Sequence, residues 1–239
     1  MKKLFLCVLI LCFSVLMLSS AASAVPLLQL DASNGWYYSG PSGIYDTETI
    51  IAQDDAFTLY ALLTPNGQTT FNDYNKQYFI SMAVWLPTSS APNFGSFTFN
   101  GTTINDGSLT TGKPLNLPSH GVFDTLYYEY DFFFDINHTV GTYNTQDNPG
   151  GFGTFPGSDT WYASFDVDTS GLASDYKIHF DLYSKIYNDN KGVWEIDKFA
   201  PFSHDVQSNG ASVPEPATMF LLGSGVLFLG VFGRKRFKK

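Results

Sequence analysis

Residues 125–135 alternate with a period of two, and this alternation limits the fold more than any other feature of the chain. One face of the segment carries only apolar and aromatic side chains, namely Leu126, Tyr128, Tyr130, Phe132 and Phe134. A helix would scatter these residues around its axis, whereas a β-strand places them on one side. The same period recurs at 57–63, 161–167 and 178–183, and residues 25–213 contain no convincing long amphipathic helix. The sequence therefore predicts an all-β fold.

Turn signals between the candidate strands indicate how they connect. Pro87 ends an apolar run over 77–86, and Asn100-Gly101, the commonest tight-hairpin pair, follows a candidate strand over 94–99. Two longer segments, 101–121 and 141–159, are expected to be loops, which are a common place for binding function. Many short antiparallel strands favour a jelly-roll-like β-sandwich, although a closed barrel would give the same periodicity.

The N-terminus has the three parts of a secretory signal peptide. Lys2 and Lys3 precede an apolar stretch over 4–18, and small residues at Ala22 and Ala24 predict cleavage before Val25. Both cysteines of the chain fall inside this leader. The predicted mature chain therefore contains no cysteine, which excludes disulfides, thiolate metal sites and cysteine catalysis from it.

The charge of the chain is unevenly distributed. Residues 25–213 carry 6 basic and 21 acidic side chains, a net charge of −15, against −9 for the whole chain. Such a surface repels the phosphates of nucleic acid, so we expect no nucleic-acid partner.

The C-terminal tail combines a proline-flanked acid, an apolar run and a basic end. The run over 217–233 has no charged residue in 17 positions, which spans roughly 25 Å as a helix and is the short end of a membrane span. The basic residues after it should stay on the cytoplasmic side. Pro214 and Pro216 keep Glu215 extended just outside the membrane, where a processing enzyme can reach it.

These residues resemble the PEP-CTERM sorting signal of exopolysaccharide-producing Gram-negative bacteria. The resemblance rests on Val213, Pro214, Glu215 and Pro216, the glycine-bearing apolar segment, and Arg234, Lys235 and Arg236. It implies recognition by exosortase, a membrane-embedded enzyme that acts near Pro-Glu-Pro, after export by the secretion machinery and removal of the leader by signal peptidase. It further implies transient anchoring in the membrane, a final location at the cell surface or outside the cell, and an association with exopolysaccharide.

A second resemblance rests on four segments of the folded region, 120–125, 165–172, 179–183 and 199–205. These segments are similar to those of the "choice-of-anchor N" family. The resemblance implies a surface role and adds no catalytic residue. The expected organisation is a signal peptide at 1–24, a β-sandwich domain at 25–206, a linker at 207–213 and a sorting signal at 214–239 with a transmembrane helix at 217–233.

Two groups of residues have the types that hydrolases use. Ser203-His204-Asp205 contains the hydrolase trio, but three consecutive residues are not expected to converge as nucleophile, base and orienting acid. Glu129 and Asp131 share a strand face at a spacing that a glycosidase could use, although such pairs arise by chance in an acidic domain. We therefore predict a protein that is not an enzyme and has no catalytic residue.

Metal binding has weak support in the sequence. Asp166 and Asp168 match the first positions of a calcium loop, but Lys177 stands where a bidentate Glu is needed, so the pair is a weak calcium candidate and turn chemistry explains it as well. His179 lies on a strand face with Asp181 and is expected to be a hydrogen-bonded surface residue. No metal and no cofactor is expected.

Aromatic side chains outside the alternating sets suggest a second function. Trp36, Tyr37 and Tyr162, with Tyr127 and Tyr183, are candidates for stacking on sugar rings, because flat aromatic faces with polar neighbours suit carbohydrate. The alternative is that they cover the rim of the sandwich. The leading hypothesis is an exported surface or matrix protein associated with exopolysaccharide; a carbohydrate-binding module is the second, and a glycan-active enzyme the third.

Overall fold

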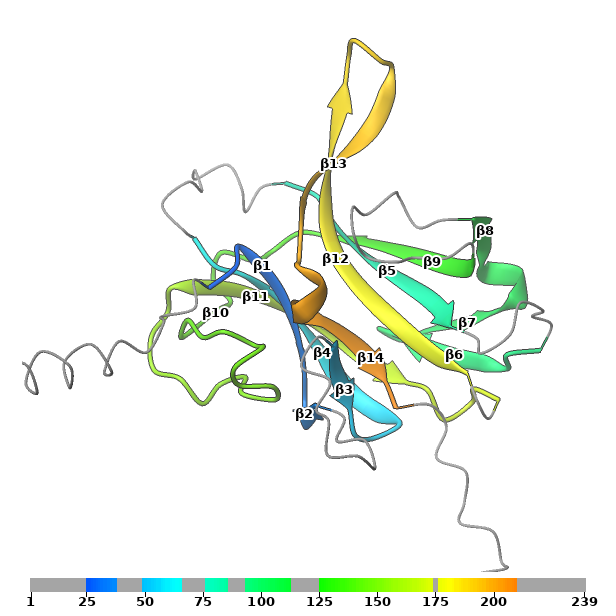
Figure 1. The fold of residues 1–239 in the computed structure, drawn as a ribbon, viewed down its shortest axis with the longest axis horizontal. Helices are drawn as coiled ribbons and strands as arrows, with labels where there is room; N and C mark the ends of the chain where they lie inside the picture. Colours follow the sequence, from blue (N-terminus) through cyan, green and yellow to red (C-terminus); the bar gives the residue numbers. More distant parts are fainter. Residues whose placement is uncertain are drawn as a thin grey trace, which may run out of the picture.

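The computed structural model describes residues 25–37, 49–65, 76–85, 93–112, 125–173 and 176–209. These residues form two β-sheets and two short 3-10 helices, η1 (Asp106–Ser108) and η2 (Phe202–His204) (Figure 1). The predicted signal helix and the predicted transmembrane helix at 217–233 lie outside the described residues. Within the described ranges, no helix has the length and apolarity to cross a membrane.

The first sheet, sheet A, has six strands, all paired antiparallel. Its order begins with β1 (Leu28–Ala32), β4 (Ala56–Leu63) and β11 (Thr160–Asp168), and continues with β6 (Ser96–Phe99) and β7 (Thr102–Asn105). The short strand β10 (Thr139–Val140) also pairs with β11.

The second sheet, sheet B, has eight strands. They run in the order β2 (Gly35–Trp36), β3 (Thr49–Ala52), β14 (Asp205–Ser208), β12 (Lys177–Asn188), β5 (Tyr78–Trp85), β9 (Thr125–Phe132) and β8 (Thr110–Gly112), and β13 (Val193–Phe199) pairs with the end of β12. The β3–β14 pair is parallel, and the other pairs of the sheet are antiparallel. Two separate sheets confirm the predicted β-sandwich over the closed barrel.

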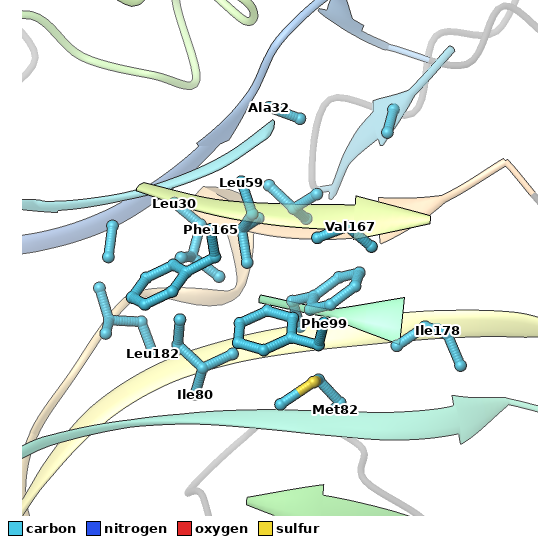
Figure 2. Packing of buried hydrophobic residues seen from close by; sticks show 14 of the residues in the cluster. Leu30, Ala32, Leu59, Ile80, Met82, Phe99, Phe165, Val167, Ile178 and Leu182 are labelled. Atoms are coloured by element: carbon cyan, nitrogen blue, oxygen red, sulfur yellow. The ribbon is translucent and has the colours of Figure 1, made fainter. Parts of the chain in front are cut away.

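The core lies between the two sheets and is built from the faces that the alternation predicted. Figure 2 shows Leu59, Phe165 and Val167 of sheet A facing Ile80, Met82 and Leu182 of sheet B. Phe99 is fully buried between the sheets, and its ring lies 5.2 Å from both Phe165 and Tyr130. Burial of these large side chains is the main stabilising contribution to the sandwich.

The tight turn after β6 forms as predicted, but the loop expected to follow it does not. Asn100 and Gly101 have positive φ angles of 48° and 77°, as a type I′ turn requires. The described part of the predicted loop at 101–121 then holds β7, η1 and β8. Ile104 is fully buried in the core. It is the one apolar side chain of β7, and its burial holds this otherwise polar strand against the core.

The folded region extends two residues beyond the predicted boundary at 206. Gln207 and Ser208 belong to β14, and the Ser208 hydroxyl accepts a buried hydrogen bond from the Ile178 amide at 2.9 Å. The polar side chains of this segment suggested a linker. Its backbone instead pairs with β3 and β12, so the described sheet ends at Ser208.

Candidate functional site

The glycine-rich segment at 141–159 packs onto the outer face of sheet A over β1. Gln29 and Asp31 point away from the core, yet both are fully buried because this segment covers them. The Gln29 amide nitrogen donates to the Tyr143 carbonyl at 3.1 Å, and its oxygen accepts from the Thr145 amide at 2.9 Å. The segment is therefore fixed to β1 by paired hydrogen bonds.

Asp31 is the centre of this attachment. Its carboxylate accepts hydrogen bonds from the Tyr143 hydroxyl at 2.6 Å, the Gly150 amide at 2.7 Å and the Ala32 amide at 2.9 Å, and also from the Phe152 backbone. Burial raises the pKa of Asp31 to about 6, although these hydrogen bonds act in the opposite direction. A single carboxylate thus joins a strand of the sheet to three positions of the covering segment.

Two glycines of the segment are required by close approach. A Cβ at Gly141 would lie 2.3 Å from the Phe155 carbonyl oxygen, and Gly150 combines a φ of 71° with a Cβ position 2.9 Å from the Gly35 carbonyl oxygen. Gly141 thus permits close packing within the segment, and Gly150 permits close approach of the segment to Gly35 of β2.

The predicted sugar-stacking residues differ in how far they are exposed. Tyr162 is half-buried, stacks on His138 and meets the ring of Phe152 edge to face at 4.9 Å. Tyr37 is half-buried, and its hydroxyl donates to the Gln146 carbonyl. Of the three, only Trp36 is exposed, by 37%. Tyr183, which we also expected at the surface, is fully buried, and its hydroxyl donates to Glu129 at 2.6 Å.

The most exposed large side chains include four on the hairpin of β12 and β13, which the sequence analysis did not single out. Strand β5 pairs with β12 only as far as Ser184, so the two strands continue alone and project from the sandwich (Figure 1). Tyr187 and Trp194 are directly opposite, 46% and 58% exposed, with ring centroids 5.4 Å apart. Ile186 and Val193, 53% and 48% exposed, lie on the other face of the hairpin.

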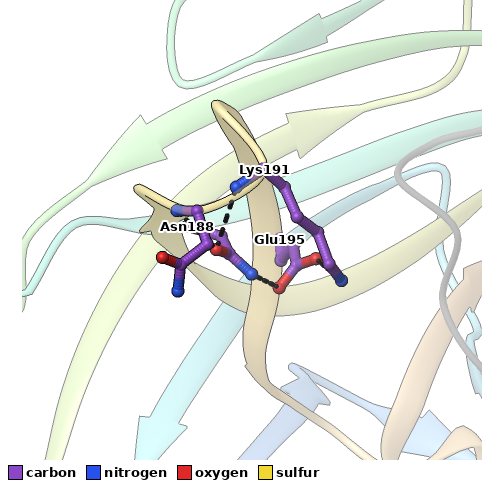
Figure 3. Close-up of polar contacts among 4 residues, drawn as sticks. Asn188, Lys191 and Glu195 are labelled. Atoms are coloured by element: carbon purple, nitrogen blue, oxygen red, sulfur yellow. Dashed lines mark hydrogen bonds and ion pairs between the residues drawn. The ribbon is translucent and has the colours of Figure 1, made fainter.

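The tip of this hairpin is held by local polar contacts (Figure 3). The Asn188 amide group donates to Glu195 at 2.9 Å, and Lys191 pairs with the same carboxylate at 2.7 Å. The Asn188 side-chain oxygen accepts from the amides of Asn190 and Lys191, and Gly192 takes the positive φ of 67° that closes the turn. These contacts define the ends of the strands that present Tyr187 and Trp194.

A second cluster lies on the outer face of sheet B, where β12 meets β14. His179 Nε2 lies 3.4 Å from Asp181 Oδ1 and 3.7 Å from Asp205 Oδ2. Asp181 and Asp205 are buried, and the side chain of His179 is only 15% exposed, so the expected surface position of His179 is wrong. Burial alone lowers the pKa of His179, but the two carboxylates outweigh it and raise the pKa to about 10.

The consecutive residues Ser203, His204 and Asp205 do not converge on one site, because His204 and Asp205 contact different partners. His204 Nε2 lies 2.9 Å from Asn144 Oδ1, which also accepts from the Gln146 amide, so Nε2 carries the proton. Nδ1 then accepts from the Ser203 hydroxyl at 2.8 Å, while Asp205 faces His179. Burial lowers the pKa of His204 to about 4, which makes it a weak base; the contact joins η2 to the segment at 141–159.

Of the remaining acidic candidates, Asp168, Glu129 and Asp131 have protein partners. Hydrogen bonds from the Ser170 side chain and from the Ser170 amide, the latter to Asp168 Oδ1 at 2.9 Å, lower the pKa of Asp168. Asp166 is exposed. Glu129 pairs with Lys185 at 2.6 Å, and Asp131 accepts from the Gln77 side chain at 2.7 Å. These contacts are those of turns and sheet surfaces.

The residues of the predicted cleavage site before Val25, and those of the predicted sorting signal, lie outside the described residues, Val25 itself excepted. The sorting signal is nevertheless tested by comparison with known families. Residues 212–236 match the family model described as the PEP-CTERM protein-sorting motif. This match contains every sorting-signal residue named from the sequence.

Comparisons of the whole chain add little. No curated protein matches it. Among solved structures, a chain from a study of the pH-induced modulation of Streptococcus parasanguinis adhesion by Fap1 fimbriae is 9% identical, with a TM-score of 0.21 over 73% of this chain and 91% of that chain. At that TM-score the likeness carries no argument about this chain. The similarity to the choice-of-anchor N family stays a prediction.

The sorting motif fixes the destination of the protein. Its parts match the order read from the sequence, with Pro-Glu-Pro first, the apolar run next and the basic residues last. Proteins with this motif are exported across the inner membrane, held for a time by the C-terminal region and processed by exosortase. The chain therefore carries a PEP-CTERM sorting motif, which marks it for export, a membrane-anchored stage and a final location at the cell surface.

Proposed function

We propose that the mature protein is a non-enzymatic surface or matrix protein that binds exopolysaccharide through Tyr187 and Trp194 of the projecting hairpin. The observation that carries the proposal is the position of this pair. Two exposed aromatic rings meet edge to face on a two-stranded ribbon that stands clear of the sandwich (Figure 1). Aromatic faces stack on the apolar faces of sugar rings, and a projecting ribbon can reach a long polymer.

The distribution of charge also favours the hairpin as the binding surface. Residues 185–198 contain three lysines and three acidic residues, so the hairpin is neutral within a region of net charge −15. Half of the six basic residues of 25–213 lie in these positions. An acidic polymer would therefore be repelled by most of the domain and least by the hairpin.

We expect Trp194→Ala to weaken retention of the protein on exopolysaccharide from its producing cells by about tenfold, which corresponds to ~1.4 kcal/mol of lost stacking. Ile186→Ala is the matched control, because it removes an exposed side chain from the opposite face of the same hairpin. Trp36→Ala tests the exposed candidate that the sequence suggested. Retention can be measured by co-sedimentation at fixed salt.

Three other results would each contradict binding through Trp194. If Trp194→Ala and Ile186→Ala lose retention equally, ring stacking is not responsible for binding. If only Trp36→Ala loses retention, the binding site lies at β2. If the wild type is not retained on any polysaccharide, the proposed function is wrong. Because Trp194 is exposed, its replacement should leave the melting temperature almost unchanged, which separates lost binding from lost folding.

A further inference from the structure

The cluster of His179, Asp181 and Asp205 is built by the register of β12 and β14. His179 pairs with Gln207 and Phe180 with Val206, so continuation of this register sets Asp181 opposite Asp205. Directly opposite residues of antiparallel strands project from the same face. His179 lies two residues before Asp181 and shares that face. Three side chains from two strands therefore meet on the side of the sheet that faces away from the core.

The distances in the cluster are those of metal ligands. One ligand atom from each residue lies within 4.8 Å of the other two. The separations of 3.4 Å and 3.7 Å from His179 Nε2 are those of ion pairs when the ring is protonated, and they are longer than the usual 2.7–3.2 Å of an N–H···O hydrogen bond. Two ligands bound tetrahedrally to one ion at about 2.0–2.1 Å lie roughly 3.3–3.4 Å apart. The cluster is already close to that spacing.

Two carboxylates lie close together in this cluster, which favours a cation beside them. Asp181 is 1% exposed and Asp205 is fully buried, and two carboxylates side by side in a buried site are costly without a positive partner. Either a proton on His179 or a divalent ion can supply the charge. The proton alone leaves a net charge of about −1 in the three side chains, whereas a divalent ion bound to neutral His179 neutralises them.

Ser81 gives a second, independent indication of a ligand. It lies on β5 directly opposite Asp181, so its side chain leaves the sheet on the same face. Ser81 is fully buried, and its hydroxyl has no hydrogen-bond partner among the described residues. A buried hydroxyl without a partner is costly, and an ion or an ion-bound water beside Asp181 would provide one.

We propose that His179, Asp181 and Asp205 bind a divalent first-row transition metal ion, Zn²⁺ in the first place, with Ser81 or a water that it holds beside the fourth position. An imidazole and two carboxylates in a compact site suit Zn²⁺, whereas Ca²⁺ requires six to eight oxygen ligands. The ion links β14 to β12. Since β14 is the last described strand before the sorting motif at 212–236, the metal stabilises the end of the folded region.

The test is metal binding by the purified full chain in detergent, stripped with a chelator and titrated with Zn²⁺. We expect the wild type to retain one more equivalent of Zn²⁺ than Asp181→Asn or Asp205→Asn, which keep side-chain volume and remove the charge. Asp166→Asn/Asp168→Asn is the matched control, because it removes two carboxylates from the surface of β11, and it should bind as the wild type does. Cys7 and Cys12 are present in every variant and cancel in the comparison.

A second measurement covers the case in which the asparagine variants fail to fold. At a hundredfold excess over its Kd, Zn²⁺ should raise the melting temperature of the wild type by about 5–10 °C, and equal Ca²⁺ should not. Co²⁺ in place of Zn²⁺ should give the visible absorption of a tetrahedral nitrogen–oxygen site. If the wild type gains neither stability nor a spectrum, or if the asparagine variants bind as much Zn²⁺, the cluster holds a proton only and the proposal is wrong.

Discussion

Replacing Asp31 with alanine should lower the free energy of unfolding by about 3–5 kcal/mol near neutral pH. The substitution leaves the Tyr143 hydroxyl and the amides of Gly150 and Ala32 without their acceptor in a buried site, and each such group costs roughly 1–3 kcal/mol. The total is less than the sum of these costs, because the buried charge of Asp31 is removed as well. Denaturant unfolding measures the difference, and the melting temperature should fall by about 10 °C.

The loss of stability in Asp31→Ala should be concentrated in the segment at 141–159. Hydrogen exchange at the Thr145 and Gly150 amides should rise in Asp31→Ala well before exchange in β5 and β12, which form the centre of sheet B. Tyr143→Phe is the matched control, since it removes one hydrogen bond and should cost only about 1–2 kcal/mol. Equal stability of Asp31→Ala and wild type would contradict the role of Asp31 as the attachment point.

The same carboxylate should make stability depend on pH in the acid range. Burial raises the pKa of Asp31 to about 6 in the folded chain, from an ordinary 3.8. The folded state therefore binds this proton more tightly, and the resulting stabilisation is full below pH 3.8 and is lost as the pH rises through 6. Between about pH 4 and pH 7 we expect a loss of about 2–3 kcal/mol from this group.

A difference between two proteins is needed to observe this effect. The pKa of His204 is lowered by burial to about 4, so its contribution is lost as the pH falls through the same range and masks that of Asp31. Asparagine at position 31 cannot titrate, so the unfolding free energy of wild type minus that of Asp31→Asn isolates the carboxyl group. That difference should decrease from pH 4 to pH 7, and a difference that is flat or increases would contradict the raised pKa.

The strands could be predicted because their signal is local. The alternation over 125–135 depends only on which face of one strand meets the core, and Leu126, Tyr128 and Tyr130 all pack against it. The Asn100-Gly101 turn is local for the same reason. The parallel pairing of β3 with β14 brings together residues 49–52 and 205–208, and no pattern in either segment records it. Sandwich and barrel were indistinguishable for the same reason, since closure depends on distant pairings.

The candidate sites could not be predicted because each depends on what covers a strand. Asp31 and Gln29 have the sequence pattern of solvent-facing residues, and only the packing of a segment more than 100 positions away buries them. Tyr187 and Trp194 lie in apolar-looking strands, but β12 extends beyond its neighbour β5 and leaves them exposed. A signal was present for His179 and Asp181, two residues apart on one face; Asp205 joins them only through the register of β14.

Pro214-Glu215-Pro216 separates two parts of the precursor that differ in charge. Before this point lies an acidic sandwich of net charge −15 over 25–213, and after it lies a tail that holds five of the chain's 13 basic residues. Removal of the tail would therefore release a strongly acidic domain. The motif is better described as a dividing point than as a tether.

The most direct test is mass spectrometry of the intact protein recovered from the surface of wild-type cells and of cells without exosortase. We expect a chain that begins at Val25 and ends near Pro214-Glu215-Pro216 in wild-type cells, and a chain that keeps its tail in cells without exosortase. An intact tail through Lys239 at the surface of wild-type cells would show that the motif is not processed.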